Sequence, residues 1–384
     1  MSREVYIIAA RRTPQGRFLG ALAGRSAADL AVEAGKAAIE DIDVGLIDWV
    51  ILGNVVAAGQ GMNVARQVGL RLGLPETVPA YTVNMMCASG MQTVALAAQA
   101  IQAGQARAVL CGGTESMSNA PFLLERARLG YRLGDGQVVD AVLRDGLVDP
   151  LSKEHMGLSA ERLGRDYGVS RQEQDAFALR SHRRHFQALE RGLFRAEIVA
   201  TKNLDRDEHP RADTSAEKLA ALKPVFDPAG AVTAGNSSGM SDGAAMLLVC
   251  DAETARRHGR KPLAIIQGWA AVGCDPARMG LGPAHATRKL CAERGYAVGD
   301  FDTVEINEAF AAQVLACLKE LDLEAGDRVN PDGGAIAVGH PIGASGARLV
   351  VHLAQRIEGG QTERGLAALC VGGGMGMAVA LERA

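Results

Sequence analysis

The sequence predicts an α/β protein made of two similar halves, with a mainly helical segment inserted between them. Two observations carry this prediction. Features of residues 1–117 recur in the same order in the C-terminal third of the chain, and segment 118–226 combines a higher charge content with clear helical spacing. Two copies of one β/α unit that pack on each other form a layered structure related by a pseudo-two-fold axis.

Four pairs of matching segments make up the internal repeat. The members of each pair lie between 254 and 260 residues apart. The pairs are Ile7–Ile8 with Ile265–Ile266, Asp48–Leu52 with Asp302–Ile306, Ala88–Gly90 with Ala344–Gly346, and Gly112–Gly113 with Gly372–Gly373. Four matches in one order at nearly one separation argue against a coincidence of Gly- and Ala-rich segments, so we interpret them as a duplication.

Hydrophobic periodicity predicts the elements of each part in order. The first half has strands at 5–9, 48–52 and 81–83, and helices at 28–39 and 91–101. The inserted segment has helices at 159–167 and 170–190, the second with Ser170 and Glu173 as a capping box. A strand at 244–250 returns to the first half, and a helix at 286–294 and a strand at 302–306 belong to the second. The predicted domains are therefore 1–117 with 227–260, 118–226, and 261–384.

Charge and composition exclude several classes of function. The 384 residues carry a net charge of −3 without a basic stripe, which argues against nucleic acid as a partner. No stretch reaches the ~18 apolar residues of a spanning helix, so no membrane partner is expected. The seven cysteines lack paired spacing, which predicts neither a disulfide framework nor a metal site. The chain starts almost directly in a strand without a leader pattern, which predicts a reducing cytoplasm.

Cys87 is the first candidate for chemistry. It lies on the predicted turn between the strand at 81–83 and the helix at 91–101. Free N–H groups and the positive end of the helix dipole at such a turn favour a thiolate, the nucleophilic form of cysteine. Most isolated cysteines are small buried core residues, so the assignment depends on what the rest of the chain places nearby.

The C-terminal half adds three further candidates. Asn307 follows the strand at 302–306, His340 lies in the glycine-rich stretch 339–346, and Cys370 precedes three glycines at 372–374. A duplicated fold brings equivalent loops together, so Cys87, His340 and Cys370 are expected to converge. One thiolate can accept an acyl group, and a second can remove a proton from the carbon alpha to another thioester.

At this point the chain resembles the thiolase family over nearly its whole length. The resembling segments are Asn84–Gly90, Gly112–Met117, His155–Gly157, Val232–Gly243, Asn307–Phe310, Gly339–Gly346 and Cys370–Gly374. The resemblance implies a five-layered αβαβα fold of two similar halves, with a coenzyme-A-binding loop domain inserted. It also implies a homo-oligomer, either a dimer or a dimer of dimers (a homotetramer).

The resemblance further implies the activity of an acetyl-CoA C-acetyltransferase or 3-ketoacyl-CoA thiolase, with coenzyme A and acetyl-CoA as substrates and no permanently bound cofactor. Cys87 would be the acylated nucleophile and Cys370 the acid and base at the alpha carbon. His340 would activate Cys87 and donate to one oxyanion, with a water held by Asn307. The N–H groups of Cys87 and Gly372 would form a second oxyanion hole. Expected contacts to coenzyme A are His155, Met156, Arg211, Phe226, Ala234, Ser238, Met279, Ala309 and Phe310.

The chain departs from the family pattern at Met85-Met86, where many relatives have a polar or basic residue, and this bears on acyl-chain preference. The Ala- and Leu-rich stretch 218–223 puts coenzyme A contacts there in doubt. Residues 182–185 (His-Arg-Arg-His) are interpreted as a solvated helix face.

Other functions stay open at this stage. A decarboxylating ketosynthase would need no base such as Cys370, and a cysteine hydrolase gives Cys370 no purpose. A non-catalytic scaffold would be favoured by loss of Cys87, His340 or Cys370, and all three are present. A disulfide between Cys87 and Cys370 could switch the enzyme off, provided that the demanding geometry is met.

Overall fold

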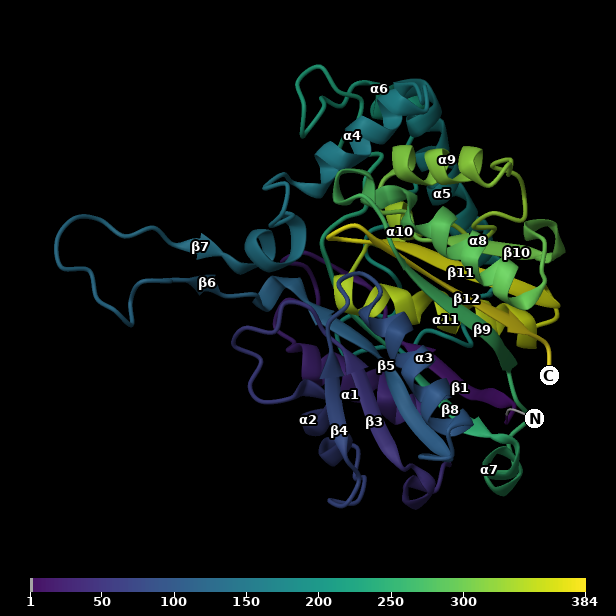
Figure 1. Ribbon diagram of the computed structural model, residues 1–384. Coiled ribbons are helices and arrows are strands. Elements are labelled where there is room, and N and C mark those ends of the chain that lie inside the picture. Colours follow the sequence, from purple (N-terminus) through teal and green to yellow (C-terminus); the bar gives the residue numbers. More distant parts are fainter. Residues whose placement is uncertain (1–2) are drawn as a thin grey trace.

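The structure is a computed structural model that describes residues 3–384 (Figure 1). Its strands are β1 Val5–Arg12, β2 Gly16–Arg17, β3 Trp49–Gly53, β4 Ala80–Val83, β5 Ala108–Ser116, β6 Phe122–Leu123, β7 Val139–Asp140, β8 Ser241–Asp251, β9 Ala264–Gly273, β10 Thr303–Ile306, β11 Arg364–Val371 and β12 Met375–Glu382. Its helices are α1 Ala27–Ala38, α2 Val64–Arg71, α3 Ser89–Gln102, α4 Met156–Asp166, α5 Arg171–Glu190, α6 Ala216–Ala220, α7 Ala252–Arg257, α8 Gly282–Arg294, α9 Ala311–Glu320, α10 Ala335–Val338 and α11 Ile342–Glu358. Short helical segments η1 Val44–Leu46, η2 Met117–Asn119, η3 Leu143–Leu147, η4 Pro276–Leu281 and η5 Val298–Asp300 connect them.

The strands repeat one pattern twice, which confirms the duplication. The first half runs β4-β3-β5-β8-β1, and the second runs β10-β11-β12-β9 with Val329 bridged to Val304 in the place equivalent to β4. Within each half the same positions pair in parallel and the same positions pair antiparallel. The two halves join where Tyr6 and Ile7 of β1 pair with Ile265 and Ala264 of β9.

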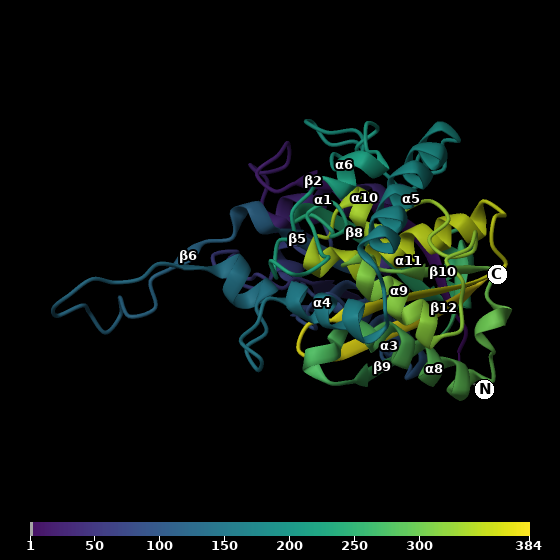
Figure 2. The ribbon, with the colours of Figure 1, turned by 90° about the horizontal axis from the view of Figure 1, so that it is seen from above.

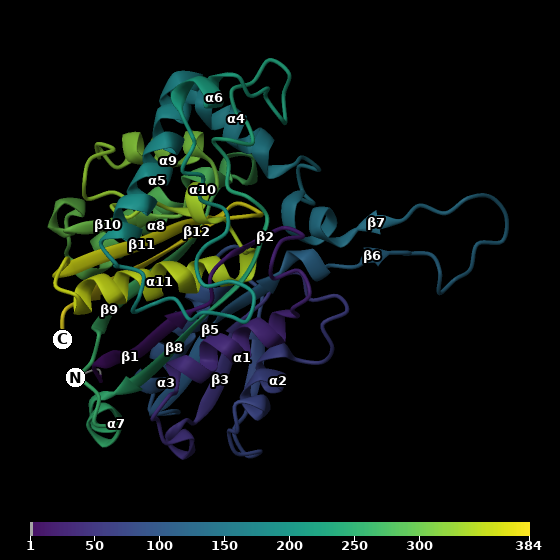
Figure 3. The same cartoon turned by 180° about the vertical axis from the view of Figure 1, so that it is seen from behind.

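Five layers result, as the family resemblance implies. α1 and α2 cover the outer face of the first half, and apolar residues of α8 and α9 cover the outer face of the second. α3 and α11 pack against each other between the two halves, in one apolar core that includes strand residues of both. Figure 3 shows α11 passing through the middle of the molecule between the two groups of strands. The middle layer matters for function because each of its helices begins just after a candidate reactive residue.

Local sequence signals explain where the helices begin. Ser170 caps α5 and exchanges hydrogen bonds with Glu173, which confirms the predicted capping box. α4 begins at Met156 rather than at 159, because the ring Nδ1 of His155 accepts the N–H of Gly157 and serves as the cap. α8 begins at Gly282, earlier than predicted, with Pro283 in its first turn, where a missing N–H costs nothing.

The inserted segment contributes α4, α5 and α6, which lie over the second half beside α9 (Figures 1 and 3). The prediction of a solvated face at 182–185 is wrong for both histidines. His182 and His185 are buried, and the His185 ring stacks on Phe194 at 4.9 Å. α5 packs against α9 and α10, which covers a helix face that looks polar in the sequence. The predicted boundaries of the three domains are not tested by these contacts and stay a prediction.

A hairpin formed by β6 and β7 projects far from the body of the molecule (Figures 1 and 2). The residues between its strands, 124–138, include Leu129 and Leu133, which are 86% and 98% exposed. Large apolar side chains this far from the core stay in contact with water unless another surface covers them, and such exposure is unfavourable. None of the helices in residues 3–384 is long and apolar enough to cross a membrane.

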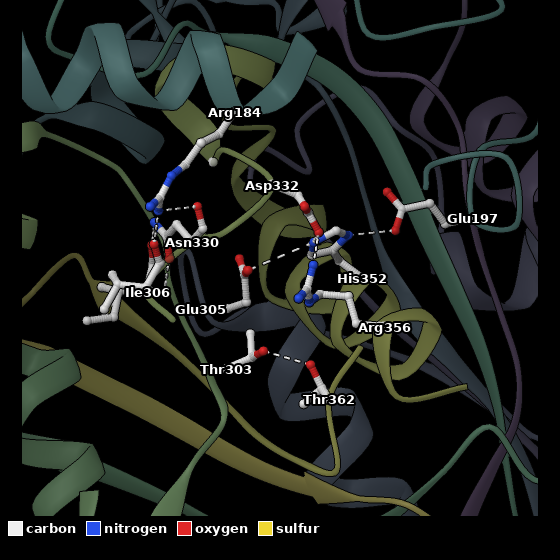
Figure 4. Close-up of polar contacts among 12 residues, drawn as sticks. Arg184, Glu197, Thr303, Glu305, Ile306, Asn330, Asp332, His352, Arg356 and Thr362 are labelled. Atoms are coloured by element: carbon white, nitrogen blue, oxygen red, sulfur yellow. Dashed lines mark hydrogen bonds and ion pairs between the residues drawn. The ribbon is translucent and has the colours of Figure 1, made fainter. Parts of the chain in front are cut away.

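A buried cluster of charges ties the insert to both halves. Arg12 of β1 bonds to Glu197 and Asp207 from the insert, at 2.8 and 2.7 Å. Figure 4 shows His352 of α11 between Glu197 and Asp332, with its Nδ1 2.9 Å from Glu197. Burial alone would lower the pKa of His352, but the neighbouring carboxylates raise it to about 10. Arg356 also pairs with Asp332. We interpret the cluster as a set of ion pairs that fixes the position of α11 relative to the insert.

Replacing His352 with Gln should destabilise the protein and flatten its alkaline stability profile. Because folding raises the pKa of His352 from 6.5 to about 10, the protonated imidazole contributes its full stabilisation below pH 6.5. This stabilisation is lost as the pH rises through about 10. Removing one partner of a buried ion pair costs about 3–5 kcal/mol. Thermal unfolding between neutral pH and pH ~10 should therefore show a smaller fall in Tm for the variant than for the wild type.

Arg364→Gln is the matched control, because Arg364 pairs with Glu382 near the surface. Such pairs contribute about 1 kcal/mol or less. An equal alkaline fall in Tm for wild type and His352→Gln would contradict the prediction.

Candidate active site

Cys87 lies on a tight turn between β4 and α3, two residues before the helix begins. The preceding Met86 has φ 47°, a left-handed conformation that is rare for a residue with a side chain. Two side chains hold the turn. Asn84 Oδ1 accepts the N–H of Met86 at 3.0 Å, and Ser89 Oγ donates to the carbonyl of Met86 at 2.7 Å. The backbone is therefore fixed on both sides of the sulfur.

The thiol of Cys87 is neutral at rest, contrary to the expected thiolate. Burial raises the pKa of the Cys87 thiol to about 11, and its hydrogen bonds with the N–H groups of Gly372 and of Cys87 itself only partly oppose this effect. The position at a helix start was predicted correctly, but the loss of hydration outweighs the helix dipole. A nucleophile in this state needs a base at the moment of attack.

His340 lies between α10 and α11 with its backbone anchored twice. Its N–H donates to Ser241 Oγ and to the carbonyl of Gly239, both at 3.0 Å. Gly339 before it has φ 100°, and a Cβ there would stand 2.2 Å from Ser241 Oγ, so only glycine fits. The site therefore fixes the backbone on which the imidazole is carried.

The imidazole of His340 is held in one tautomer. Its Nδ1 lies 2.5 Å from Ser345 Oγ, which donates its own hydrogen to the carbonyl of Pro341 at 2.9 Å. Nδ1 must therefore carry the proton that Ser345 accepts, which leaves the lone pair on Nε2. Nε2 is buried without a hydrogen-bond partner among residues 3–384. Burial, with Arg348 nearby, lowers the pKa of His340 to about 4, so the ring is a neutral acceptor.

Cys370 and Asn307 end two neighbouring strands of the second half. Burial, with the adjacent Cys87, raises the pKa of the Cys370 thiol well above its usual value. Asn307 follows β10, and its N–H donates to Ala368 of β11 at 2.9 Å. Both polar atoms of the Asn307 amide are buried and have no hydrogen-bond partner in the described part of the chain. A buried polar group of this kind is usually satisfied by an ordered water or by a ligand.

One pocket of about 380 Å³ joins Cys87, His340 and Cys370. Eight of the nine predicted coenzyme A contacts line the same pocket: His155, Met156, Phe226, Ala234, Ser238, Met279, Ala309 and Phe310. Its walls are mostly apolar and aromatic. The Phe226 ring stacks on His155 at 4.5 Å and meets Phe310 edge-on at 6.0 Å. The structure thus brings the three candidate reactive side chains together from both halves, and the insert supplies one wall.

Three predicted residues lie outside this lining. Arg211 lines a neighbouring pocket of about 380 Å³, together with Arg17, His209 and Lys218. Gly372 reaches Cys87 through its N–H and borders a third cavity, of about 540 Å³. Asn307 is buried and does not line the pocket. The second pocket is more polar and basic, which suits phosphate groups better than an acyl chain.

The sequence interpretation missed several lining residues. These are Met117, Leu143, Leu147, Val225, Ser237, Gly239, Met240 and Ile342. Leu143 and Leu147 are four residues apart in a segment expected only to be part of the insert, and this spacing was the available signal. Ser345 was also missed as the partner of His340. A serine one turn into a helix normally suggests only local backbone bonding.

The arrangement can support acyl transfer followed by proton removal at carbon. The neutral thiol of Cys87 shares the pocket with a neutral imidazole whose Nε2 has no hydrogen-bond partner in the residues that the structure describes, two N–H groups bond to the Cys87 sulfur, and a second buried thiol lines the same pocket. Two thiols and one imidazole in a mostly apolar pocket suit a substrate that carries a thioester on a long flexible arm.

Comparisons with known proteins agree with this site. Residues 5–253 match the family model "Thiolase, N-terminal domain", and residues 260–383 match "Thiolase, C-terminal domain". The chain is 50% identical to an acetyl-CoA acetyltransferase of Escherichia coli, with 99% of each chain covered. It is 46% identical to a beta-ketoadipyl-CoA thiolase of Pseudomonas aeruginosa, with full coverage of both.

Solved structures give the same result. The acetyl-CoA acetyltransferase of Bacillus anthracis superposes with a TM-score of 0.95 at 43% identity, covering 99% of each chain. Human mitochondrial 3-ketoacyl-CoA thiolase in complex with CoA superposes with a TM-score of 0.96 at 39% identity, covering 100% of this chain and 98% of the other. The predicted family and fold are therefore confirmed, and this chain belongs to the thiolase family.

Proposed function

We propose that the protein is an acetyl-CoA C-acetyltransferase, which condenses two molecules of acetyl-CoA to acetoacetyl-CoA and runs the reverse thiolysis. The convergence of Cys87, His340 and Cys370 on one pocket carries the proposal. The full-length similarity to acetyl-CoA acetyltransferases supports the substrate. Coenzyme A and acetyl-CoA are substrates, and the reaction as written below uses no further cofactor.

In the first half-reaction, His340 Nε2 takes the proton from the Cys87 thiol as the sulfur attacks the thioester carbonyl of acetyl-CoA. The N–H groups of Cys87 and Gly372 stabilise the oxyanion of the tetrahedral intermediate, and one such donor contributes about 10²–10³ in rate. The C–S bond to coenzyme A then breaks, and Cys370 donates its proton to the departing thiolate. The products are acetyl-Cys87, free coenzyme A and a Cys370 thiolate.

In the second half-reaction, the Cys370 thiolate removes a proton from the methyl carbon of a second acetyl-CoA. His340, now protonated, and a water on the Asn307 amide stabilise the enolate oxygen. The enolate carbon attacks the acetyl-Cys87 carbonyl, the bond to Cys87 breaks to release acetoacetyl-CoA, and His340 returns its proton to the departing Cys87 thiolate. The unpartnered polar atoms of His340 and Asn307 support their places in this step. A Cys370 thiol of raised pKa suits a group that acts as an acid first and as a base second.

Thiolysis of longer 3-ketoacyl-CoA substrates is the second candidate function. It is favoured by the third cavity, which lies next to the Cys87 pocket and shares Met156 with it. Met86 and Gly372 also line this cavity, and a Cβ on Gly372 would lie 3.0 Å from the Met156 sulfur and 3.4 Å from the Met86 methyl, so the two methionines pack closely on Gly372. Methionine side chains are flexible enough to repack around an acyl chain.

The two candidate functions are distinguished by comparing the rates at which the enzyme cleaves acetoacetyl-CoA and a six-carbon 3-ketoacyl-CoA with coenzyme A. We expect the short substrate to have the higher kcat/KM, because a longer acyl chain would require Met86 and Met156 to repack. Preference for the longer substrate would replace the first candidate by the second. Cleavage of neither by folded protein would contradict both.

A homo-oligomer, either a dimer or a dimer of dimers, belongs to the same proposal. The exposed leucines of the projecting hairpin support it, since apolar residues at such a tip need a partner surface. In a dimer of dimers, we expect this hairpin to form the contact between the two dimers. A cytoplasmic location is also proposed, supported by seven cysteines that are all unpaired, and imaging of the tagged protein in its own cells tests it.

Leu129→Ser with Leu133→Ser should halve the mass of the assembly measured by light scattering. Each Å² of apolar surface that is no longer buried makes the free energy of association less favourable by roughly 25 cal/mol. Removing two large side chains from a small apolar contact should therefore weaken the affinity between the dimers at least several-fold. Arg128→Ser and Arg132→Ser together are the control, because they alter the same loop without removing apolar surface. A wild-type monomer, or an unchanged mass in the leucine variant, would contradict this role of the hairpin.

A further inference from the structure

Glu115 is a buried carboxylate that the proposed reaction does not use. It lies near the end of β5, has no exposed surface, and does not line the Cys87 pocket. It stands between the loop after β3, the turn that carries Cys87, and the start of α11. A charge buried in this position is costly unless its surroundings compensate for it.

Four donors surround the carboxylate. Oε1 accepts from the Asn54 side chain at 2.8 Å and from the N–H of Val56 at 3.2 Å. Oε2 accepts from the N–H of Val55 at 3.1 Å and from the N–H of Gly343 at 2.9 Å. Each partner in these bonds is a donor, so the site is built for the ionised form. Burial raises the pKa of Glu115 to about 7, and these N–H groups keep it from rising further.

The bond to Gly343 links the first half of the molecule to the helix that follows His340. Gly343 is the second residue of α11, and its N–H is one of the free donors at the positive end of that helix. A Cβ on Gly343 would lie 2.7 Å from the Thr114 carbonyl and 2.8 Å from Glu115 Oε2. Only glycine lets the helix start come this close to β5. The carboxylate therefore sets the position of the segment that carries His340.

The same charge faces the nucleophile. After burial, Glu115 is the group that further raises the pKa of the Cys87 thiol, because a nearby negative charge disfavours a thiolate. Cys370 and His340 share the pocket with Cys87, and a charge on Cys87 raises the pKa of the Cys370 thiol. Asp242 of β8 is the charged group that raises the pKa of Glu115, and Arg348 of α11 acts on His340 instead.

We propose that Glu115 is a positioning residue whose carboxylate fixes the start of α11, and with it His340, and whose charge adds to the effect of burial in disfavouring a thiolate at Cys87. This inference rests on the proposed function, in which Cys87 is the nucleophile and His340 its base. In this role Glu115 places the base, His340, and contributes to keeping the thiol of Cys87 neutral before the base acts.

The first test measures the pH dependence of Cys87 alkylation by iodoacetamide, read from the mass of the Cys87 peptide. Glu115→Gln keeps the shape of the side chain and removes the charge, so the alkylation midpoint should move to lower pH by at least about half a unit. In acetoacetyl-CoA thiolysis its kcat should fall about 10- to 100-fold through misplacement of His340. The KM for coenzyme A should change little, since the residues that would bind it lie on other elements. Asp242→Asn, which removes another buried charge bonded to Ser118, is the control and should leave the midpoint in place.

A second variant separates charge from position. Glu115→Asp keeps the charge but withdraws it from Gly343, so kcat should fall while the alkylation midpoint stays at the wild-type value. If circular dichroism shows that Glu115→Gln does not fold, the Glu115→Asp variant alone tests the positioning role. An unchanged midpoint in Glu115→Gln, or an unchanged kcat in both variants, overturns the inference. Failure of wild-type thiolysis would instead overturn the proposed function, while the alkylation arm would still report on the charge of Glu115.

Discussion

Cys87→Ala should abolish cleavage of acetoacetyl-CoA by coenzyme A, with a loss in kcat of at least about 1000-fold. The substitution removes the only atom of the pocket that the proposed reaction acylates, and no other group can hold the acetyl unit between the half-reactions. Residual turnover would have to come from direct attack by coenzyme A, without the covalent intermediate that divides one difficult step into two. The assay follows the disappearance of acetoacetyl-CoA by absorbance.

The fold should survive this substitution, because alanine fits where the small thiol stood. Cys291→Ala is the matched control: Cys291 is also buried, but it lies in α8 and outside the pocket. The control should keep wild-type turnover. Retention of more than about a tenth of the activity in Cys87→Ala would remove Cys87 from the centre of the reaction.

Cys370→Ala should lose condensation and thiolysis while still forming acetyl-Cys87. The variant keeps the nucleophile, the base at His340 and both N–H donors, so attack on acetyl-CoA remains possible. It has no group to take the proton from the second acetyl-CoA, and general acid–base groups of this kind contribute about 10²–10⁴ in rate. Mass spectrometry after incubation with acetyl-CoA should therefore show the acetyl adduct on the Cys87 peptide.

The acetylation of Cys370→Ala should be slower than that of the wild type, because the departing coenzyme A thiolate also lacks its proton donor. Cys317→Ala is a suitable control, since Cys317 is buried in α9 and donates to the Gly280 carbonyl at 3.0 Å. Full condensation activity in Cys370→Ala, or a failure to acetylate Cys87 at all, would contradict the division of roles between the two cysteines.

Much of the fold was predictable because its signals are local or repeated. The matched segments gave the order of elements in both halves, and the capping box at Ser170 and Glu173 placed the start of α5. Boundaries were missed where the capping group was unusual. At α4 the cap is the ring nitrogen of His155, a residue outside the common capping set, so the predicted start fell three residues late.

The candidate reactive residues were also found from the sequence, since each lies beside glycines or at the end of an element. The burial and partners of other residues were not predictable. His182 and His185 look like part of a polar helix face, but both are buried: the N–H of Arg211 donates to His182 Nδ1, and the ring of His185 stacks on Phe194. Glu115 gave no signal either, because its partners Asn54 and Gly343 are distant in the sequence and meet only when the halves pack.

The sequence by itself determined the duplicated α/β architecture and the identity of the thiols and imidazole that meet in the pocket. Only the tertiary structure decided their protonation states. The helix start at Cys87 favours a thiolate in isolation, yet burial raises the pKa of its thiol to about 11. The bond to Ser345 selects the tautomer of His340. Local sequence fixes where a side chain leaves the backbone, whereas hydration and long-range contacts, which exist only in the folded chain, set which form of the group is stable.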